Sequence, residues 1–251
     1  MKWWIGCSGF YYKPWREKFY PRELPQRKWF EYYCGHFDTV ETNGTFYKLP
    51  APSVFANWLK LAPRDFSFFV KGSRFVTHFK HLKDPQASLE RFFDAVAPLK
   101  KKLAGVLWQL PGKWNVDVPR LREFLKTLRT FSNTRVVMEF RNPTWFSAEV
   151  TETLREFDAI YCRADMPDFY LQLHIPDTAN YVYLRRHGAG EAVRYSGNYD
   201  DAALKKDADE IERLRAAGKD VFVYFNNDIG GHALRNAKRL REMVWDSLKS
   251  S

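Results

Sequence analysis

The chain has 251 residues, of which 45% are apolar and 17% aromatic, so it is long enough to bury a large core. No stretch approaches the roughly 20 consecutive apolar residues of a membrane-spanning helix. We therefore do not expect a membrane-spanning protein. The net charge of +10 at pH 7 favours anionic partners, such as nucleic acid or phosphorylated metabolites.

The cysteine content and the N-terminal segment indicate a cytoplasmic protein. Three cysteines, Cys7, Cys34 and Cys162, form no CxxC motif and no disulfide framework. The first residues are apolar only as far as Gly6, which does not match a signal peptide. No Gly/Ser-rich or Pro-rich linker interrupts the chain, so residues 1–251 are predicted to form one domain of undetermined oligomeric state.

Short runs of apolar, β-branched and aromatic residues recur along the chain and end in polar residues. They lie at 3–9, 38–44, 66–72, 105–111, 136–142, 159–165, 181–188 and 221–228. Strands that alternate with helices predict a parallel sheet buried on both faces. The length is close to the roughly 250 residues of one such barrel. The sequence therefore predicts an α/β fold, a TIM-like (β/α) barrel of about eight parallel strands.

Between these runs the 3.6-residue period of amphipathic helices appears. It is clearest over 89–96, 121–128, 204–214 and 233–244, and shorter versions cover 29–33, 54–61 and 150–157. Residues 166–180 contain two prolines and show no helical period. The sixth crossover is therefore predicted to be irregular.

Polar and charged side chains stand at the end of almost every predicted strand. In a (β/α) barrel the carboxyl ends of the strands carry the active site, and residues two apart share a face of the strand. If these alternate residues point into the barrel, they form a ring at one of its mouths. The ring consists of Ser8, Glu41, Asn43, Lys71, Gln109, Glu139, Arg141, Asp165, Arg185, His187, Tyr224 and Asn226. Each residue also has a structural alternative, because strand ends use polar residues as caps and turn formers.

Three residues of this ring are predicted to be catalytic. Glu41 and Glu139 are the acid/base candidates, because two carboxylates in one cavity can be driven to different pKa values. His187 is a candidate general base. The alternatives are a structural ion-pair network around Glu139 and a hydrogen-bonded histidine at the barrel rim.

The other polar residues suit the binding of a small anionic ligand that carries a phosphate or resembles a sugar. Lys71, Arg141 and Arg185 are predicted to hold its phosphate or carboxylate. The remaining predicted substrate-binding residues are Asn43, Gln109, Asp165, Tyr224, Asn226 and Asn227.

No metal site and no cofactor are predicted. HExxH, GxGxxG and P-loop motifs are missing from the sequence. A divalent ion shared by Glu139, Asp165 and His187 remains an open alternative.

The segments that follow the strands are rich in aromatic residues, such as Phe46 and Tyr47 beside Lys48. Rings beside cations can stack on sugar faces or on bases. Together with the net charge, this composition leaves open a second function, that of a non-catalytic module that binds nucleic acid or its fragments.

The sequence resembles the YecE-like barrel proteins, a prokaryotic family of unknown function (DUF72), over nearly its whole length. The segments that carry the resemblance are 5–21, 37–50, 66–78, 105–114, 136–146, 181–188 and 221–240. The resemblance implies a TIM-like barrel and leaves the reaction open. The recurring polar positions of the family correspond here to Glu41, Asn43, Thr45, Lys71, Gln109, Glu139, Arg141, Arg185, His187, Asn226 and Asn227.

The leading expectation is an enzyme, a possible hydrolase or isomerase. It would perform acid/base chemistry on an anionic sugar- or nucleotide-like substrate at the C-terminal mouth of the barrel.

Overall fold

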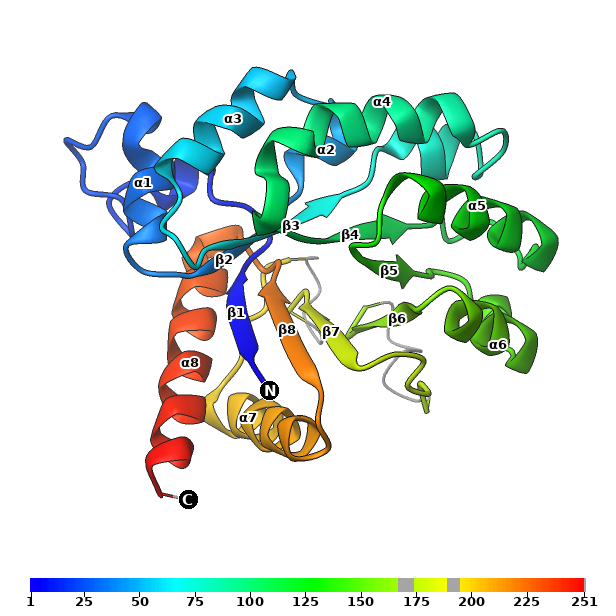
Figure 1. Ribbon diagram of the computed structural model, residues 1–251. Helices are drawn as coiled ribbons and strands as arrows, with labels where there is room; N and C mark the ends of the chain where they lie inside the picture. The colour runs from blue at the N-terminus through cyan, green and yellow to red at the C-terminus, as the bar shows by residue number, and fades with distance from the viewer. Residues whose placement is uncertain (167–173, 189–194, 251) are drawn as a thin grey trace. The chain divides into compact units, whose positions relative to one another are not determined.

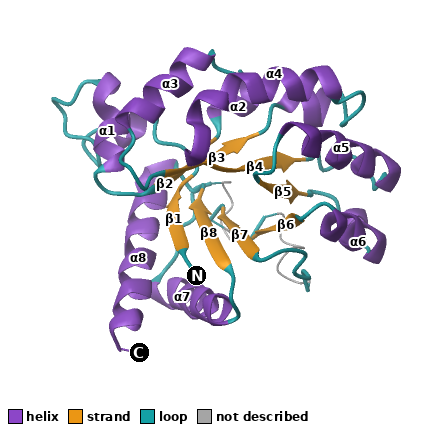
Figure 2. Cartoon of the chain, viewed as in Figure 1, coloured by secondary structure: helices purple, strands orange, loops and turns teal. Residues whose placement is uncertain are grey.

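Strands and helices alternate along the chain in the computed structural model (Figures 1 and 2). The structure describes residues 1–166, 174–188 and 195–250. The strands within them are β1 (Trp3–Cys7), β2 (Thr39–Thr42), β3 (Ser67–Lys71), β4 (Leu103–Gln109), β5 (Arg135–Glu139), β6 (Ala159–Ala164), β7 (Tyr181–Arg186) and β8 (Asp220–Phe225).

The helices of the described residues follow the strands in turn. They are α1 (Trp29–Cys34), α2 (Gly44–Tyr47), α3 (Pro52–Leu61), α4 (Gln86–Val96), α5 (Val118–Phe131), α6 (Ala148–Glu156), α7 (Asp201–Ala216) and α8 (His232–Ser250). Short 3₁₀ turns are η1 (Lys13–Trp15), η2 (Gln26–Lys28), η4 (Ala97–Lys102), η5 (Pro143–Trp145) and η7 (Ile229–Gly231), and η3 (Phe75–Phe79) is a single π-helical turn.

The predicted elements agree closely with those observed. All eight predicted strands are present, although most predicted runs extend beyond the strand, because their polar ends belong to the loops. Residues 174–180 carry no helix, in keeping with an irregular sixth crossover, whereas 167–173 lie outside the described residues. The sequence analysis missed α2 and η3, which are too short to show a periodic pattern.

The chain divides into two compact units, each described here by itself. The first contains Met1–Glu41, Arg163–Leu173 and Asn180–Ser251, and the second contains Thr42–Cys162 and His174–Ala179. The single domain expected over 1–251 therefore stays a prediction.

In the first unit, β8 pairs in parallel with both β1 and β7. Gly6 and Arg185 lie on either side of Tyr224 in the register. The helices α7 and α8 flank these strands in Figure 1. Because the pairing is parallel, the polar ends of these strands lie at one edge of the sheet.

In the second unit, β3, β4, β5 and β6 pair in parallel in that order. The ring of Trp108 contacts Phe92 of α4 and Phe124 of α5, at centroid distances of 5.1 and 5.2 Å. Since alternate residues of a strand face opposite sides, Gln109 faces away from these helices. Glu139 lies beside Gln109 in the register and shares that side.

The hydroxyl of Tyr33, on α1, links β1 to β2. It accepts a hydrogen bond from the backbone N–H of Cys7 and donates one to the carbonyl of Thr39, both at 3.0 Å. Glycine at position 6 permits the close approach, since a Cβ there would lie 2.5 Å from the Thr39 carbonyl oxygen. The side chain of Tyr33 thus supplies hydrogen-bond partners for one backbone group of β1 and one of β2.

Replacing Tyr33 by phenylalanine is expected to lower the free energy of unfolding by about 2–6 kcal/mol. The reason is that a buried N–H and a buried C=O each lose a partner, at about 1–3 kcal/mol apiece. Urea denaturation measures the change. Tyr11→Phe is the matched control, because the Tyr11 hydroxyl contacts Gln26 at the surface. If both variants lost the same free energy of unfolding, the proposed role of the Tyr33 hydroxyl in linking β1 to β2 would be contradicted.

No helix in the described part of the chain combines the length and the apolar character needed to cross a membrane.

Candidate functional site

Glu41, at the end of β2, is completely buried, and both of its carboxylate oxygens are held by β7. The hydroxyl of Tyr183 donates to Oε2 at 2.5 Å, and Nη2 of Arg185 donates to Oε1 at 2.8 Å. Arg185 is also completely buried. A buried ion pair persists only where further hydrogen bonds compensate the lost hydration, and Tyr183 supplies one of these.

His187 continues the network beyond Arg185. Its Nε2 lies 3.1 Å from Nη1 of Arg185, and its Nδ1 lies 3.1 Å from Oδ1 of Asp165. A guanidinium group only donates hydrogen bonds, so Nε2 must be the accepting nitrogen and Nδ1 carries the proton. The two contacts of His187 therefore fit the Nδ1–H tautomer.

Asp165 ends the network as a carboxylate. Burial raises its pKa, but the hydrogen bond from His187, the charge of Arg186 and the hydroxyl of Tyr199 outweigh this effect and bring the pKa to about 2. The backbone N–H of His187 also donates to Asp165, at 2.8 Å. Burial and the neighbouring Asp165 raise the pKa of Tyr199, so it remains a phenol.

Asp228 follows β8 and lies in the electrostatic field of the Glu41–Arg185 pair. Its backbone carbonyl accepts hydrogen bonds from the indole of Trp15 and the N–H of Gly231, at 3.2 and 3.1 Å. Its Oδ1 is buried and has no hydrogen-bond partner among the described residues. Unlike Glu41, the residue as a whole is half-buried.

The pKa of Asp228 is about 7, far above that of an ordinary carboxyl group. Burial raises it, and the negative charge of Glu41 raises it further. The hydrogen bond with Tyr12 and the charge of Arg185 oppose this only in part. A carboxyl group with this pKa exists in both protonation states near neutral pH, which is what acid/base chemistry requires.

The other predicted residues of the first unit have mainly structural contacts. The hydroxyl of Tyr224 lies 2.5 Å from that of Thr39. The amide of Asn227 donates to Gly197 and to Asn236, at 2.7 and 2.8 Å. The backbone N–H of Asn226 donates to the carbonyl of Arg186 at 2.7 Å, and the residue as a whole is 8% exposed.

In the second unit, Glu139 is fully buried and forms an ion pair with Arg141, whose side chain is 13% exposed. Asn43 and Gln109 are half-buried. The Glu139–Arg141 pair fits the predicted ion-pair alternative, and the side chain of Arg141 remains partly exposed.

Lys71 of the second unit belongs to a cluster of positive charge. Its Nζ lies 4.3 Å from the centre of the Phe46 ring, a cation–π contact. Nearby, the pKa of His78 falls to about 4, because of burial and then the charges of Lys71, Arg74, His81 and Arg141. The surroundings of His78 therefore repel an additional positive charge and favour a negative one.

The predicted site residues are thus divided between the units. Glu41, Asp165, Arg185 and His187, four members of the predicted ring, lie in one continuous network of the first unit. The second unit holds Asn43, Lys71, Gln109, Glu139 and Arg141. Among described residues, no group of three or more His, Cys, Asp or Glu side chains is arranged to hold a metal ion.

The sequence analysis missed Asp228 and Tyr199 as functional candidates. A signal for Asp228 was present, since it continues the alternation of Tyr224 and Asn226 beyond β8. Tyr199 had no comparable signal, because it lies in a loop before α7 and reaches Asp165 only through the tertiary fold.

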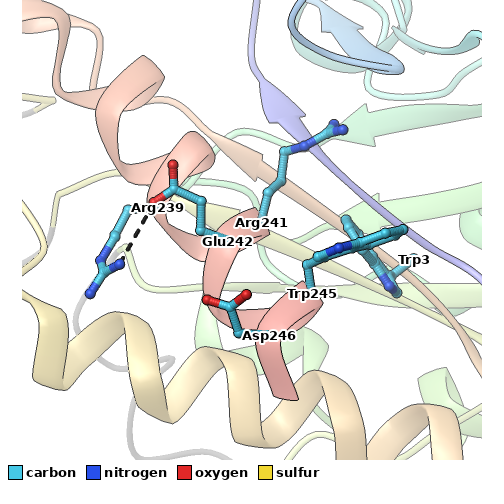
Figure 3. Close-up of a pocket in the computed structure, with 6 residues that line it drawn as sticks. All are labelled: Trp3, Arg239, Arg241, Glu242, Trp245 and Asp246. Carbon is cyan, nitrogen blue, oxygen red and sulfur yellow. Dashed lines mark ion pairs between the residues drawn. The ribbon is translucent and has the colours of Figure 1, made fainter. Parts of the chain in front are cut away.

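A separate groove of about 330 Å³ lies along α8 (Figure 3). It is lined by Trp3, Arg239, Arg241, Glu242, Trp245 and Asp246. Its two arginines are both in ion pairs, Arg239 with Asp201 and Glu242, and Arg241 with Asp38. Since these charges are compensated, the groove has no strong preference for an anion.

The parallel strands followed by helices, with polar groups at the strand ends, define a TIM-like (β/α) barrel protein. In keeping with this class, the structure superposes on a protein described as a xylose isomerase-like TIM barrel/4-hydroxyphenylpyruvate dioxygenase fusion, with a TM-score of 0.55 over 100% of this chain and 44% of that one, at 17% identity. Within this class, the chain belongs to the family described as "Protein of unknown function DUF72", whose model matches residues 4–250.

Proteins of known sequence or structure are similar to this chain. The UPF0759 protein YunF of Bacillus subtilis is 27% identical, over 91% of this chain and 90% of its own length. The UPF0759 protein YecE of Escherichia coli is 32% identical over 49% of this chain and 46% of its own length. The crystal structure of a DUF72 family protein from Thermotoga maritima matches with a TM-score of 0.84 and 30% identity, covering 98% of this chain and 100% of the other.

Proposed function

We propose that this protein is an enzyme that performs acid/base chemistry, either hydrolysis or isomerisation, on an anionic sugar- or nucleotide-like substrate. The observation that carries the proposal is Asp228, a half-buried residue whose carboxyl group has a pKa of about 7 in the field of the buried Glu41–Arg185 pair. A carboxylate kept partly protonated at neutral pH is costly for stability and useful for proton transfer.

The two carboxylates of the first unit have different roles in this proposal. Asp228 exchanges a proton with the substrate, because it is the more exposed of the two. Glu41 is a positioning residue that holds Arg185 and raises the pKa of Asp228 through its charge. His187, with Nε2 occupied by Arg185, fixes that guanidinium in turn.

We also propose that the second unit binds an anion, because several positively charged side chains lie close together in it. Lys71 and Arg141 surround His78 with positive charge, and Arg141 remains partly exposed although it pairs with Glu139. Guanidinium and ammonium groups in such a setting bind phosphate or carboxylate. Anion binding by Lys71 and Arg141 stays a prediction, as do the predicted roles of Asn43 and Gln109.

The test is a turnover screen of sugar phosphates and nucleotides, followed by NMR spectroscopy of the products. We expect Asp228→Asn to lower kcat for any converted compound about 10²–10⁴-fold, the usual contribution of a general acid or base. The pH–rate profile of the parent should show a group that titrates near pH 7, and the variant should lose it.

Asp246→Asn serves as the matched control, because Asp246 is an exposed carboxylate in the groove on α8 (Figure 3). This control should keep the activity and the pH profile of the parent. Turnover by Asp228→Asn at the parental rate, with an unchanged profile, would disprove the proposed role of Asp228.

A further inference from the structure

The segment from Thr42 to Lys83, which lies in the second unit, has an unusual charge composition. It contains seven Lys and Arg residues and one acidic residue, Asp65. Two histidines, His78 and His81, add to its basic character. The segment therefore carries a large share of the net charge of +10 in one sixth of the chain. Charge concentrated in this way attracts polyanions.

Three large rings of this segment are exposed to solvent: Tyr47 at 72%, Phe75 at 51% and Phe79 at 63%. The two phenylalanines begin and end the π-helical turn η3, and Tyr47 ends α2. Single π-helical turns are uncommon and frequently occur at functional sites. Exposed rings gathered on short elements are typical of interaction surfaces.

Cations lie against these rings. The guanidinium carbon of Arg74 is 4.9 Å from the ring centre of Phe79 and 6.0 Å from that of Tyr47, so it lies near both. Nζ of Lys80 is 5.9 Å from the ring centre of Phe75. Arg74 forms no ion pair with any carboxylate in the described part of the chain. Its charge is therefore available to an incoming anion.

We propose that Tyr47, Arg74, Phe75, Phe79 and Lys80 form a binding surface for single-stranded nucleic acid. Exposed rings can stack on bases, and the cations beside them can neutralise phosphates. Successive bases of a strand stack on separate rings, so three exposed rings favour a strand over a mononucleotide. This surface goes beyond the proposed acid/base chemistry and does not depend on it.

The test is the binding of a fluorescein-labelled oligothymidylate of about 12 nucleotides, a length in the range of known single-strand sites, measured by fluorescence anisotropy at two salt concentrations. We expect Tyr47→Ala and Phe79→Ala each to raise Kd about 5- to 150-fold, the loss that follows removal of one stacking ring. Arg74→Ala should weaken binding and reduce the slope of log K against log salt by about 0.7.

Trp245→Ala is the matched control, because Trp245 is a 53% exposed ring in the groove on α8, where the arginines are already paired. It should bind the oligonucleotide like the parent. The proposal is overturned if the parent does not bind at low salt, if Trp245→Ala loses as much affinity as Tyr47→Ala, or if the ring variants bind normally.

Three competing ligands complete the experiment. A duplex of the same length should bind more weakly than the single strand, because its bases are hidden. Tighter or equal duplex binding, equally effective competition by thymidine monophosphate, or binding of phosphatidylserine vesicles without binding of the oligonucleotide would each overturn the proposal. Turnover plays no part in this measurement, so failure of the proposed enzyme activity would leave the result unaffected.

His78 provides an independent spectroscopic readout. Its ring lies 5.1 Å from that of Phe46, which in turn contacts Tyr47 at 5.1 Å. The pKa of His78 is held near 4 by burial and by the surrounding cations, so bound phosphates should raise it toward its usual value near 6.5. An NMR titration should show this rise with the oligonucleotide. An unchanged pKa at saturation would place the strand elsewhere and overturn the proposal.

Discussion

Replacing Arg185 by methionine is expected to lower the free energy of unfolding by about 3–5 kcal/mol, a large fraction of the stability of a typical protein. The substitution leaves the carboxylate of Glu41 completely buried without its guanidinium partner. It also removes the donor to Nε2 of His187. Urea denaturation of the purified variant measures the loss.

Two further variants distinguish a buried charge from a general effect of losing arginine. Adding Glu41→Gln to Arg185→Met removes the isolated charge and should recover much of the stability. Arg213→Met removes an arginine from an exposed ion pair with Glu210 and should cost at most about 1 kcal/mol. If Arg185→Met lowers the free energy of unfolding no more than Arg213→Met does, the buried Glu41–Arg185 pair does not contribute to stability as described above.

The Asp228→Asn variant is expected to be more stable than the parent at pH 8, by about 2–4 kcal/mol, and similar to it near pH 4. Between about pH 4 and pH 7 the folded parent retains a proton on Asp228 that the unfolded chain has released. The stability of the parent therefore falls as pH rises, by up to about 1.4 kcal/mol per pH unit. Asparagine does not titrate in this range, so the stability of the variant should not show this decrease as the pH rises.

Urea denaturation of parent and variant at several pH values measures the difference between them. Asp246→Asn should follow the parent at every pH, because Asp246 is exposed. A difference that does not change between pH 4 and pH 8 would show that the environment of Asp228 does not raise its pKa. A stabilising substitution that also abolishes turnover is typical of a functional site.

Local sequence patterns predicted the elements of this fold well. The runs that contain Val136 and Val221 are strands because apolar and β-branched residues recur there between turn signals. The helices α5 and α7 begin at the capping residues Asp117 and Asp200, whose carboxylates accept backbone N–H groups. The short elements α2 and η3 were missed, because four or five residues are too few to display a period.

The sequence predicted that the candidate residues stand at strand ends, and it predicted less about which of them pair. Glu41, Arg185, His187 and Asp165 were expected at strand ends, and they form one network. The contacts of Arg185 with Glu41 and of His187 with Asp165 were not predictable, because each joins residues that are far apart in sequence. Arg163 illustrates this: it occupies a strand as Arg185 does, yet it pairs with Glu210 on α7.

By itself, the sequence determined where strands and helices form and that charged groups stand at the strand ends, because both depend on neighbouring residues along the chain. Only the tertiary structure decided which charges are neutralised and which remain available. Glu41 is enclosed by Tyr183 and Arg185, whereas Asp228 keeps a pKa near 7. Burial and the distance between charges set these properties, and both arise only when distant segments are brought together.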